Sequence, residues 1–210
     1  HFCTVTLSAR YFDIIKDRLY IAAPRSVARR SAQTALYEIA HQLCRLLAPI
    51  LAFTADEAWE SLPGDREESV HMAVFPMTRG CIRGDEDEIA QKKMLSDWER
   101  IFEIRDVVLR SLETARGDKL IGSSLEAKVI VTADAEMTRF LLGHYDQLRY
   151  IFIVSQVEVH ESDAFGVLIV KADGEKCERC WNYSTRVGEL ERWPTVCERC
   201  AEALTEITDQ

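Results

Sequence analysis

Four cysteines restrict what the last part of this chain can fold into. They lie in the stretch "KCERCWNYSTRVGELERWPTVCERC" with the spacing Cys-x2-Cys-x16-Cys-x2-Cys, at Cys177, Cys180, Cys197 and Cys200. A Cys-x-x-Cys turn brings two sulfurs to one ion about 2.3 Å away, and two such turns complete the tetrahedron that zinc prefers. We therefore predict that these four cysteines hold one zinc ion. Because four thiolates leave no position for water, the predicted zinc is structural rather than catalytic.

Three other roles for the cysteines are open but fit less well. A thioredoxin-like redox site uses a single Cys-x-x-Cys at the start of a helix in a βαβ unit. A disulfide framework is typical of a short secreted chain with an even cysteine count, whereas this chain has seven cysteines. The symmetric spacing also fits zinc better than an iron–sulfur cluster. With Cys3, Cys44 and Cys81 standing singly, a reducing, cytoplasmic compartment is the better prediction.

Composition limits the class of protein. A chain of 210 residues with 47% hydrophobic residues can bury a core and form one large or two modest domains. The net charge of −9 argues against a protein that coats nucleic acid without specificity. Residues 1–53 nevertheless carry seven basic and three acidic side chains, which indicates a local basic surface. No apolar run reaches the roughly 20 residues of a membrane span, so a soluble protein without a membrane partner is expected.

Hydrophobic periodicity predicts a helical first part. Helices are expected over 8–20 and 26–53, with an end or kink at Pro49, and a short helix opened by a capping box of Thr54 and Glu57 should stop at Pro63. A loop over 64–84 precedes a long helix from Asp85 to Arg116, with Gly117 as its stop. The residues expected to face the core are Tyr11, Ile14, Ile15, Leu19, Leu36, Ile39, Leu43, Leu46, Leu47, Ile50, Ile89, Met94, Trp98, Ile101, Phe102, Val108, Leu109 and Leu112.

The period changes after residue 117. The stretch "LEAKVIVTA" is a predicted strand, "DAEMTRFLLGHY" a predicted short helix, and "YIFIVSQVEVHES" and "FGVLIVKA" are predicted strands with a turn at 163–166. The predicted fold class is thus mainly an α-helical bundle, followed by a small α+β domain and a four-cysteine zinc knuckle. The predicted domains cover residues 1–117, 118–174 and 175–210, the last one including a C-terminal helix.

Motifs for catalysis are missing from the sequence. There is no phosphate-binding loop, no dinucleotide fingerprint and no nucleophile elbow, and the five histidines are dispersed. In the knuckle, Trp181 stands among Arg179 and Arg186, and aromatics interleaved with arginines can stack on unpaired bases. The alternative is that Trp181 and Trp193 pack around the metal as a small core, and acidic residues that match the basic ones caution against RNA.

Six blocks of sequence, in order, resemble a known family. "YFDIIKDRLY", "RRSAQTALYEI", "LLAPILAFTADEAW", "GDKLIGSSLEAKV", "FIVSQVEV" and "KCERCW…CERC" are similar to the C-terminal portion of bacterial isoleucyl-tRNA synthetases, which are class I aminoacyl-tRNA synthetases. The resemblance implies that the bundle is an anticodon-binding domain, that tRNA(Ile) is the partner through its anticodon stem-loop, and that the four cysteines bind zinc. It also implies RNA contacts, which we assign to Lys16, Arg18, Arg29, Arg30, Arg179, Trp181 and Arg186.

The same resemblance implies a division of labour. In the family, ATP and Mg²⁺ serve a catalytic domain that lies upstream, as does an editing domain, and the signatures of the catalytic domain do not occur in this sequence. The chain is therefore expected to be a non-catalytic, monomeric part of an isoleucine–tRNA ligase. The alternative is a zinc-stabilised module that braces a larger assembly without touching RNA.

Overall fold

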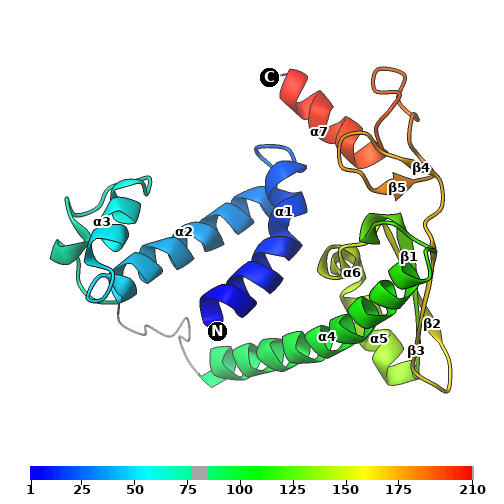
Figure 1. Cartoon of the computed structure of the whole chain (residues 1–210), viewed down its shortest axis with the longest axis horizontal. Coiled ribbons are helices and arrows are strands. Elements are labelled where there is room, and N and C mark those ends of the chain that lie inside the picture. The colour runs from blue at the N-terminus through cyan, green and yellow to red at the C-terminus, as the bar shows by residue number, and fades with distance from the viewer. Residues whose placement is uncertain (77–84, 210) are drawn as a thin grey trace. The chain divides into compact units, whose positions relative to one another are not determined.

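Residues 1–76 and 85–209 are described by a computed structural model, in which the chain divides into two units (Figure 1). The first unit comprises His1–Pro24 and Leu95–Gln210, and the second comprises Arg25–Met94. Cys81 and the last part of the predicted 64–84 loop lie outside the described residues. Among the helices that the structure describes, none is long and apolar enough to cross a membrane. The three domains predicted from the sequence stay a prediction.

The first unit begins with two consecutive helical segments, whereas the 8–20 pattern predicts one helix. A π-helical segment, η1 (Phe2–Phe12), leads directly into helix α1 (Asp13–Tyr20). The apolar positions Ile14 and Ile15 are buried. Ile21, the C-cap residue that follows α1, donates its amide to the Asp17 carbonyl at 2.8 Å. This last turn of α1 lies close to the four-cysteine segment, as described below.

The long helix α4 (Asp85–Gly117) confirms the predicted start and nearly the predicted end. Gly117 is its last residue rather than its stop. The left-handed residue is Lys119, with φ 58°, and the amide of Leu120 closes the helix by donating to the Ala115 carbonyl at 2.9 Å. Such a 6→1 hydrogen bond satisfies a carbonyl that the helix end would otherwise leave unpaired.

Among the described residues of α4, those of its C-terminal part are the ones that pack into the main core. Ile101, Val108 and Leu112 are buried in the main core, as predicted. Ile89 and Met94 are 69% and 51% exposed, so the prediction that they face a core is wrong for the described residues. Periodicity identifies the apolar face of a helix but not how much of its length finds a partner.

A three-stranded sheet carries the core of the first unit. The central strand β1 (Ala127–Ala133) pairs in parallel with β2 (Gln156–Glu161) and antiparallel with β3 (Gly166–Lys171). Helices α5 (Ala135–Gly143) and α6 (Tyr145–Phe152) connect β1 to β2 (Figure 1). Every second residue of β1 is buried, from Ala127 to Ala133. The α+β prediction for this region is confirmed.

The predicted strand over 150–162 begins too early. Residues 150–152 belong to α6, whose apolar side chains Leu148, Ile151 and Phe152 are buried at helical spacing. The helix ends at Ile153, which adopts a left-handed conformation with φ 57°. The strand therefore starts only at Gln156.

The second unit contains a helical hairpin. Helix α2 (Val27–Leu47) starts after the N-cap Ser26, whose hydroxyl accepts the Arg29 amide, and it ends before Pro49 as predicted. Helix α3 (Ala52–Glu60) starts earlier than predicted, because Leu51 is its N-cap. Thr54 therefore lies inside α3, and the predicted capping box is wrong.

The small core of the second unit forms around Trp59. Its side chain is fully buried and forms one cluster with the buried residues Cys44, Ala48, Ala55 and Val70. The Trp59 indole donates to the Glu67 carbonyl at 2.9 Å. The 3₁₀ turn Val70–Met72 (η2) closes over this core. The other side of the hairpin is less covered than predicted: Leu46 is 43% exposed and Ile50 is 80% exposed.

Replacement of Trp59 by alanine should destabilise the second unit. Removal of a fully buried indole leaves a cavity and an unpaired carbonyl, so we expect a loss of about 3–5 kcal/mol in the free energy of unfolding. Urea denaturation followed by far-ultraviolet circular dichroism measures this loss. Phe53→Ala is the matched control, because Phe53 is 92% exposed. Equal effects of the two substitutions would contradict the assignment of this core.

Candidate metal centre

Two short elements place the four cysteines. Cys177 and Cys180 lie in the turn between strands β4 (Glu175–Lys176) and β5 (Tyr183–Ser184), which pair antiparallel. Cys197 is the N-cap of helix α7 (Glu198–Thr208), and Cys200 lies in its first turn. Gly174, with φ 85°, is required before β4, because a Cβ there would lie 2.3 Å from the Ser184 backbone. The predicted C-terminal helix is thus present.

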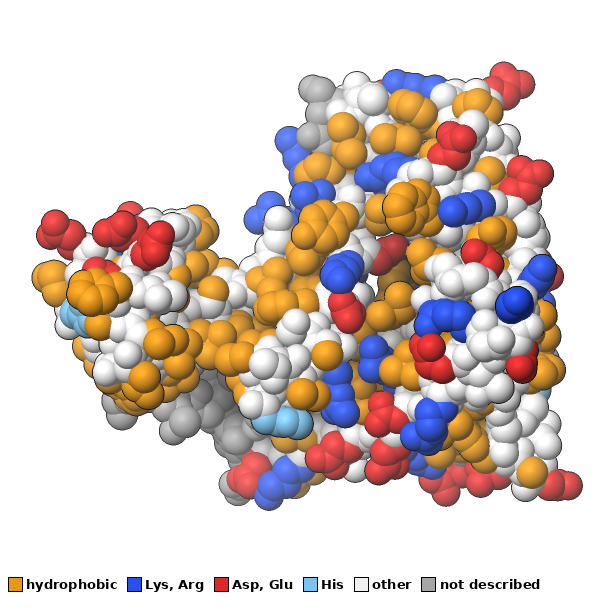
Figure 2. Space-filling model, in the orientation of Figure 1, with side chains coloured by type: hydrophobic (Ala, Val, Ile, Leu, Met, Phe, Trp, Pro, Cys, Tyr) orange, Lys and Arg blue, Asp and Glu red, His pale blue; other side chains and the backbone are white. Residues whose placement is uncertain are grey.

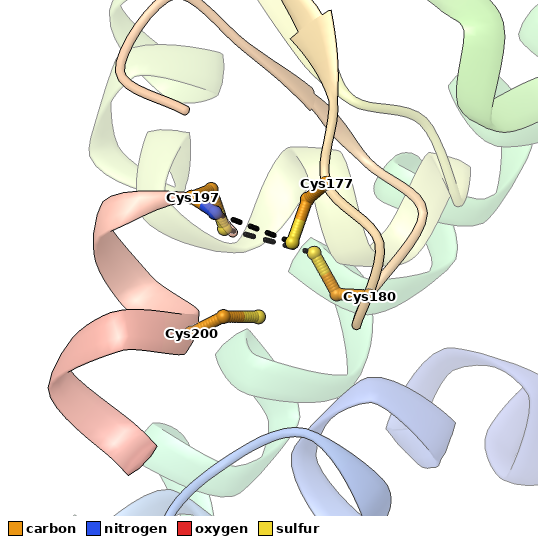
Figure 3. A group of neighbouring side chains, drawn as sticks. All are labelled: Cys177, Cys180, Cys197 and Cys200. Carbon is orange, nitrogen blue, oxygen red and sulfur yellow. Dashed lines mark hydrogen bonds between the residues drawn. The ribbon is translucent and has the colours of Figure 1, made fainter. Parts of the chain in front are cut away.

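The four sulfurs point toward one centre (Figure 3). All of them are buried and lie within 4.8 Å of one another, and the Sγ atoms of Cys180 and Cys197 are 3.7 Å apart. Four sulfurs at about 2.3 Å from a tetrahedral ion lie roughly 3.8 Å apart, whereas a disulfide needs about 2.05 Å. The spacing in the structure therefore fits a tetrahedral metal ion and does not fit disulfides.

Hydrogen bonds among the sulfurs shift their protonation. Bonds from Cys197 and Cys200 hold the pKa of the Cys180 thiol well below its usual range. The bond to Cys180 raises the pKa of Cys197 to about 11 and also raises the pKa of Cys200. In the absence of a cation, a close group of sulfurs thus shares protons instead of ionising independently. A divalent cation would displace these protons, because thiolates are the ligating form.

Groups around the sulfurs support them. The Cys197 amide donates to the Sγ of Cys177 at 3.3 Å, and a guanidinium nitrogen of Arg179 lies 3.6 Å from the Sγ of Cys200. Val196 and Ala201 complete the buried cluster, against which Ile21 packs. Contacts of this kind orient metal ligands and tune their basicity.

The two tryptophans of the segment behave differently. Trp193 packs against the cysteine cluster, and its indole donates to Thr205 at 3.3 Å. Trp181 is 61% exposed, with the Lys176 amine 5.5 Å from its ring centroid. The packing alternative therefore describes Trp193 but not Trp181.

Three of the predicted RNA-binding residues border one cavity. Lys16, Arg179 and Trp181 line a hollow of about 590 Å³ between α1, α6 and the cysteine turn. Lys16 is exposed and pairs with Asp13 at 2.6 Å. Arg179 is half-buried and donates to the Ile21 carbonyl at 2.8 Å. The sequence pattern did not single out Tyr20, which borders the same cavity and is 74% exposed.

The other predicted RNA-binding residues lie elsewhere. Arg18 is half-buried, donates to Gln147 and stacks over Tyr150. Arg186 is exposed and bonded to Glu189 at 2.7 Å. Arg29 and Arg30 belong to the first turns of α2 in the second unit. On the face shown in Figure 2, basic side chains are interspersed with acidic and hydrophobic ones.

A partly buried ion pair between Arg199 and Asp17 was not predicted from the sequence. Arg199 and Asp17 are 182 positions apart, and both side chains are 23% exposed. The Nη2 of Arg199 donates to Asp17 Oδ2 at 2.9 Å, and Nη1 contacts Oδ1. The repeated "CERC" was the available signal, because it places an arginine before the second cysteine of each pair.

Comparison with known proteins places the chain in a family. The family model described as "Anticodon-binding domain of tRNA ligase" matches residues 1–131. The chain belongs to this family. A second model, "Zinc finger found in FPG and IleRS", matches residues 174–203 and so contains all four cysteines. The resemblance of the sequence blocks to isoleucyl-tRNA synthetases is thereby confirmed.

Several relatives of this chain are isoleucine–tRNA ligases. The chain is 45% identical to that of Syntrophotalea carbinolica, over 98% of this chain and 23% of the ligase. It is 44% identical to that of Carboxydothermus hydrogenoformans, over 100% of this chain and 23% of the ligase. It is also 44% identical to that of Neisseria gonorrhoeae, over 96% of this chain and 21% of the ligase. The chain spans less than a quarter of these relatives.

Ser155 should link the cysteine segment to the sheet. Its buried hydroxyl donates to the Leu125 carbonyl at 2.5 Å and accepts the Tyr183 amide at 2.7 Å. Ser155→Ala should lower the free energy of unfolding by about 1–3 kcal/mol, because both partly buried partners lose a hydrogen bond. Thermal denaturation of the substituted protein measures the loss. Ser162→Ala, at an exposed serine, should be nearly neutral, and an equal loss there would contradict the link.

Proposed function

We propose that this chain is the tRNA-recognition part of an isoleucine–tRNA ligase and that Cys177, Cys180, Cys197 and Cys200 hold one structural zinc ion. The observation that carries the zinc assignment is the convergence of four buried sulfurs with a 3.7 Å separation between Cys180 and Cys197. When bound, zinc supplies the bonds that tie the β4–β5 turn to the start of α7. The match to the zinc-finger model supports the same assignment.

The proposed ligand is the anticodon stem-loop of tRNA(Ile). Membership in the anticodon-binding family supports an RNA partner, and the exposed ring of Trp181 offers a stacking surface. Lys16 and Tyr20 border the same cavity as Trp181. Unpaired bases stack on aromatic rings while cations hold the phosphates, so this combination suits a single-stranded loop.

The other arginines proposed to contact RNA should contribute less to its affinity than Lys16 and Trp181. Arg186, Arg29 and Arg30 do not border the cavity that Trp181 borders, so we assign them contacts to phosphates rather than to bases. Arg18 and Arg179 already donate to protein acceptors. Lys16 also pairs with Asp13 but is exposed, whereas Arg18 and Arg179 are half-buried. We therefore place these two arginines behind Lys16 and Trp181 in their contribution to RNA affinity.

The whole ligase is proposed to join isoleucine to tRNA(Ile) in the cytoplasm as a monomer. ATP and Mg²⁺ would serve its catalytic part, and we assign no catalytic role to any residue of this chain. In this division of labour, the zinc segment stabilises a recognition surface and takes no part in bond making.

Zinc binding should release protons. Because Cys197 has a pKa of about 11 and that of Cys200 is raised, both thiols must lose a proton to bind metal. Since each released proton contributes a factor of about ten, zinc affinity should rise by about a hundredfold per pH unit between pH 6.5 and 7.5. Chelator competition at several pH values measures this slope, and about one zinc per chain is expected at saturation.

Cysteine substitutions separate this site from the rest of the chain. Cys197→Ser should abolish stoichiometric zinc binding, whereas Cys44→Ser should leave it unchanged because Cys44 packs in the core around Trp59. Zinc content well below one ion per chain in the unsubstituted protein would refute the metal assignment.

Titration with tRNA(Ile) tests the RNA role. The zinc-loaded chain should bind tRNA(Ile) and should lose affinity for a transcript with an altered anticodon. Trp181→Ala should weaken binding by roughly 5- to 100-fold, the effect of one lost base stack. Lys16→Ala should weaken binding and reduce the salt slope by about one.

Controls and an opposing outcome accompany this titration. Phe165→Ala removes an aromatic side chain that is 46% exposed in the turn before β3, and it should leave affinity unchanged. Measurements at two salt concentrations separate phosphate contacts from stacking. If binding is absent or is indifferent to the anticodon, the chain acts as a brace in a larger assembly and not as a recognition surface.

A further inference from the structure

Each Cys-x-x-Cys pair carries an arginine directed at the same short segment. Arg179 precedes Cys180, and Arg199 precedes Cys200. Both side chains contact the segment 17–21, which is the last turn of α1 and the residue that follows it: Arg199 bonds to Asp17, and Arg179 bonds to Ile21. The two Cys-x-x-Cys turns are separated by sixteen residues in sequence, yet the arginines that they carry contact the same helix end.

Arg199 makes the stronger of the two contacts. Its guanidinium forms a two-armed ion pair with Asp17 and lies 5.6 Å from the centroid of the Tyr150 ring, whose hydroxyl it contacts at 3.3 Å. Two-armed pairs of this kind fix orientation as well as supplying energy. Because both side chains are only 23% exposed, removal of one of them leaves the other charge partly buried without its partner.

Arg179 joins the metal site to the same helix end. One of its terminal nitrogens lies 2.8 Å from the Ile21 carbonyl and 3.6 Å from the Sγ of Cys200. The carbonyls at a helix C-terminus lack partners within the helix, and a cation is favourable there. A donor to a ligating sulfur is also an outer contact of the kind that strengthens metal binding. A single side chain therefore serves both the helix end and the sulfur cluster.

The segment around the sulfurs has little else to fix these arginines. Its buried cluster is small, consisting of the four cysteines with Val196 and Ala201, and the partly buried residues packed against it are Ile21, Val187, Trp193 and Leu204. Without a bound ion, the two turns would keep backbone hydrogen bonds such as that from the Trp181 amide to the Cys177 carbonyl, but would lose the metal–sulfur bonds that hold one turn against the other. The two arginines would then no longer be held in a fixed direction relative to each other.

We propose that Arg179 and Arg199 are positioning residues that couple metal occupancy to the end of α1. A metal ion fixes both Cys-x-x-Cys turns, the turns aim the arginines, and the arginines hold residues 17–21. This inference rests on the proposed zinc site but not on the proposed RNA binding. Its functional consequence is that zinc would order Lys16 and the rim of the cavity from a distance.

Hydrogen exchange of the full chain tests the coupling. The amides of Ile21 and Ala22 both donate to the Asp17 carbonyl, so their exchange reports the last turn of α1. Removal of zinc by a chelator should speed exchange over 17–22 by roughly tenfold or more, with β1 unchanged. In the zinc-loaded protein, Arg199→Ala should speed exchange over 17–22 to a similar degree while zinc stays bound.

Matched variants make the test specific. Arg192→Ala is the control, because Arg192 belongs to the same segment but pairs with Asp209 and Thr208 instead of α1. Arg192→Ala should leave exchange over 17–22 unchanged. Arg179→Ala should weaken zinc affinity by roughly 10- to 100-fold in chelator competition. If Arg199→Ala does not fold, Asp17→Asn removes the same ion pair from the α1 side and should give the same exchange pattern.

The outcomes separate this inference from the zinc assignment. Zinc content is measured first, and a chain that binds no zinc refutes both. A chain that binds one zinc, yet shows unchanged exchange over 17–22 after chelation and in the Arg199→Ala protein, refutes the coupling alone. Effects of Arg192→Ala equal to those of Arg199→Ala would also refute it.

Discussion

The first unit depends on the burial of strand β1. Every second residue from Ala127 to Ala133 is buried, and both edges of the strand are paired. Its side chains share one core with the C-terminal part of α4 and with α6. The buried Arg105 of α4 donates to the Ile151 carbonyl at 2.8 Å and so fixes the end of α6 against this core. This contact therefore also fixes the turn that follows α6. The turn contains Ser155 and forms part of the wall of the cavity.

The cysteine segment attaches to this frame without a large core of its own. A short chain segment buries too little apolar surface to offset the entropy of ordering it. The sulfur cluster and a few polar bonds stabilise the segment instead, because Ser155 joins β5 to the sheet and Arg199 joins α7 to α1. The segment is thus held from two sides by bonds whose partners lie far away in sequence.

Local features of the fold were predictable from the sequence. The cysteine spacing predicts the sulfur cluster, Pro49 the end of α2, and the alternating residues of 127–133 the central strand. The helix end and the strand depend on neighbours within a few positions, and the sulfur cluster depends on the spacing of two Cys-x-x-Cys turns within one segment. Features set by distant parts of the chain were not predictable in the same way. Residues 150–152 are β-branched or aromatic, yet they are helical because Leu148, Ile151 and Phe152 face the core together. Arg179 is a predicted RNA contact in the sequence, and only the fold reveals its bond to Ile21.

The backbone conformation at Trp181 has a consequence for the proposed stacking of a base on its ring. This residue holds a left-handed conformation, φ 64°, which costs an L-amino acid with a large side chain about 1–2 kcal/mol. Hydrogen bonds on both sides keep it there: its own amide donates to the Cys177 carbonyl, and the Cys177 amide donates to the Asn182 carbonyl. The indole is therefore presented to solvent by a turn whose shape is fixed during folding. A base that stacks on it would meet a surface already ordered, so less conformational entropy is lost on binding than with a flexible loop.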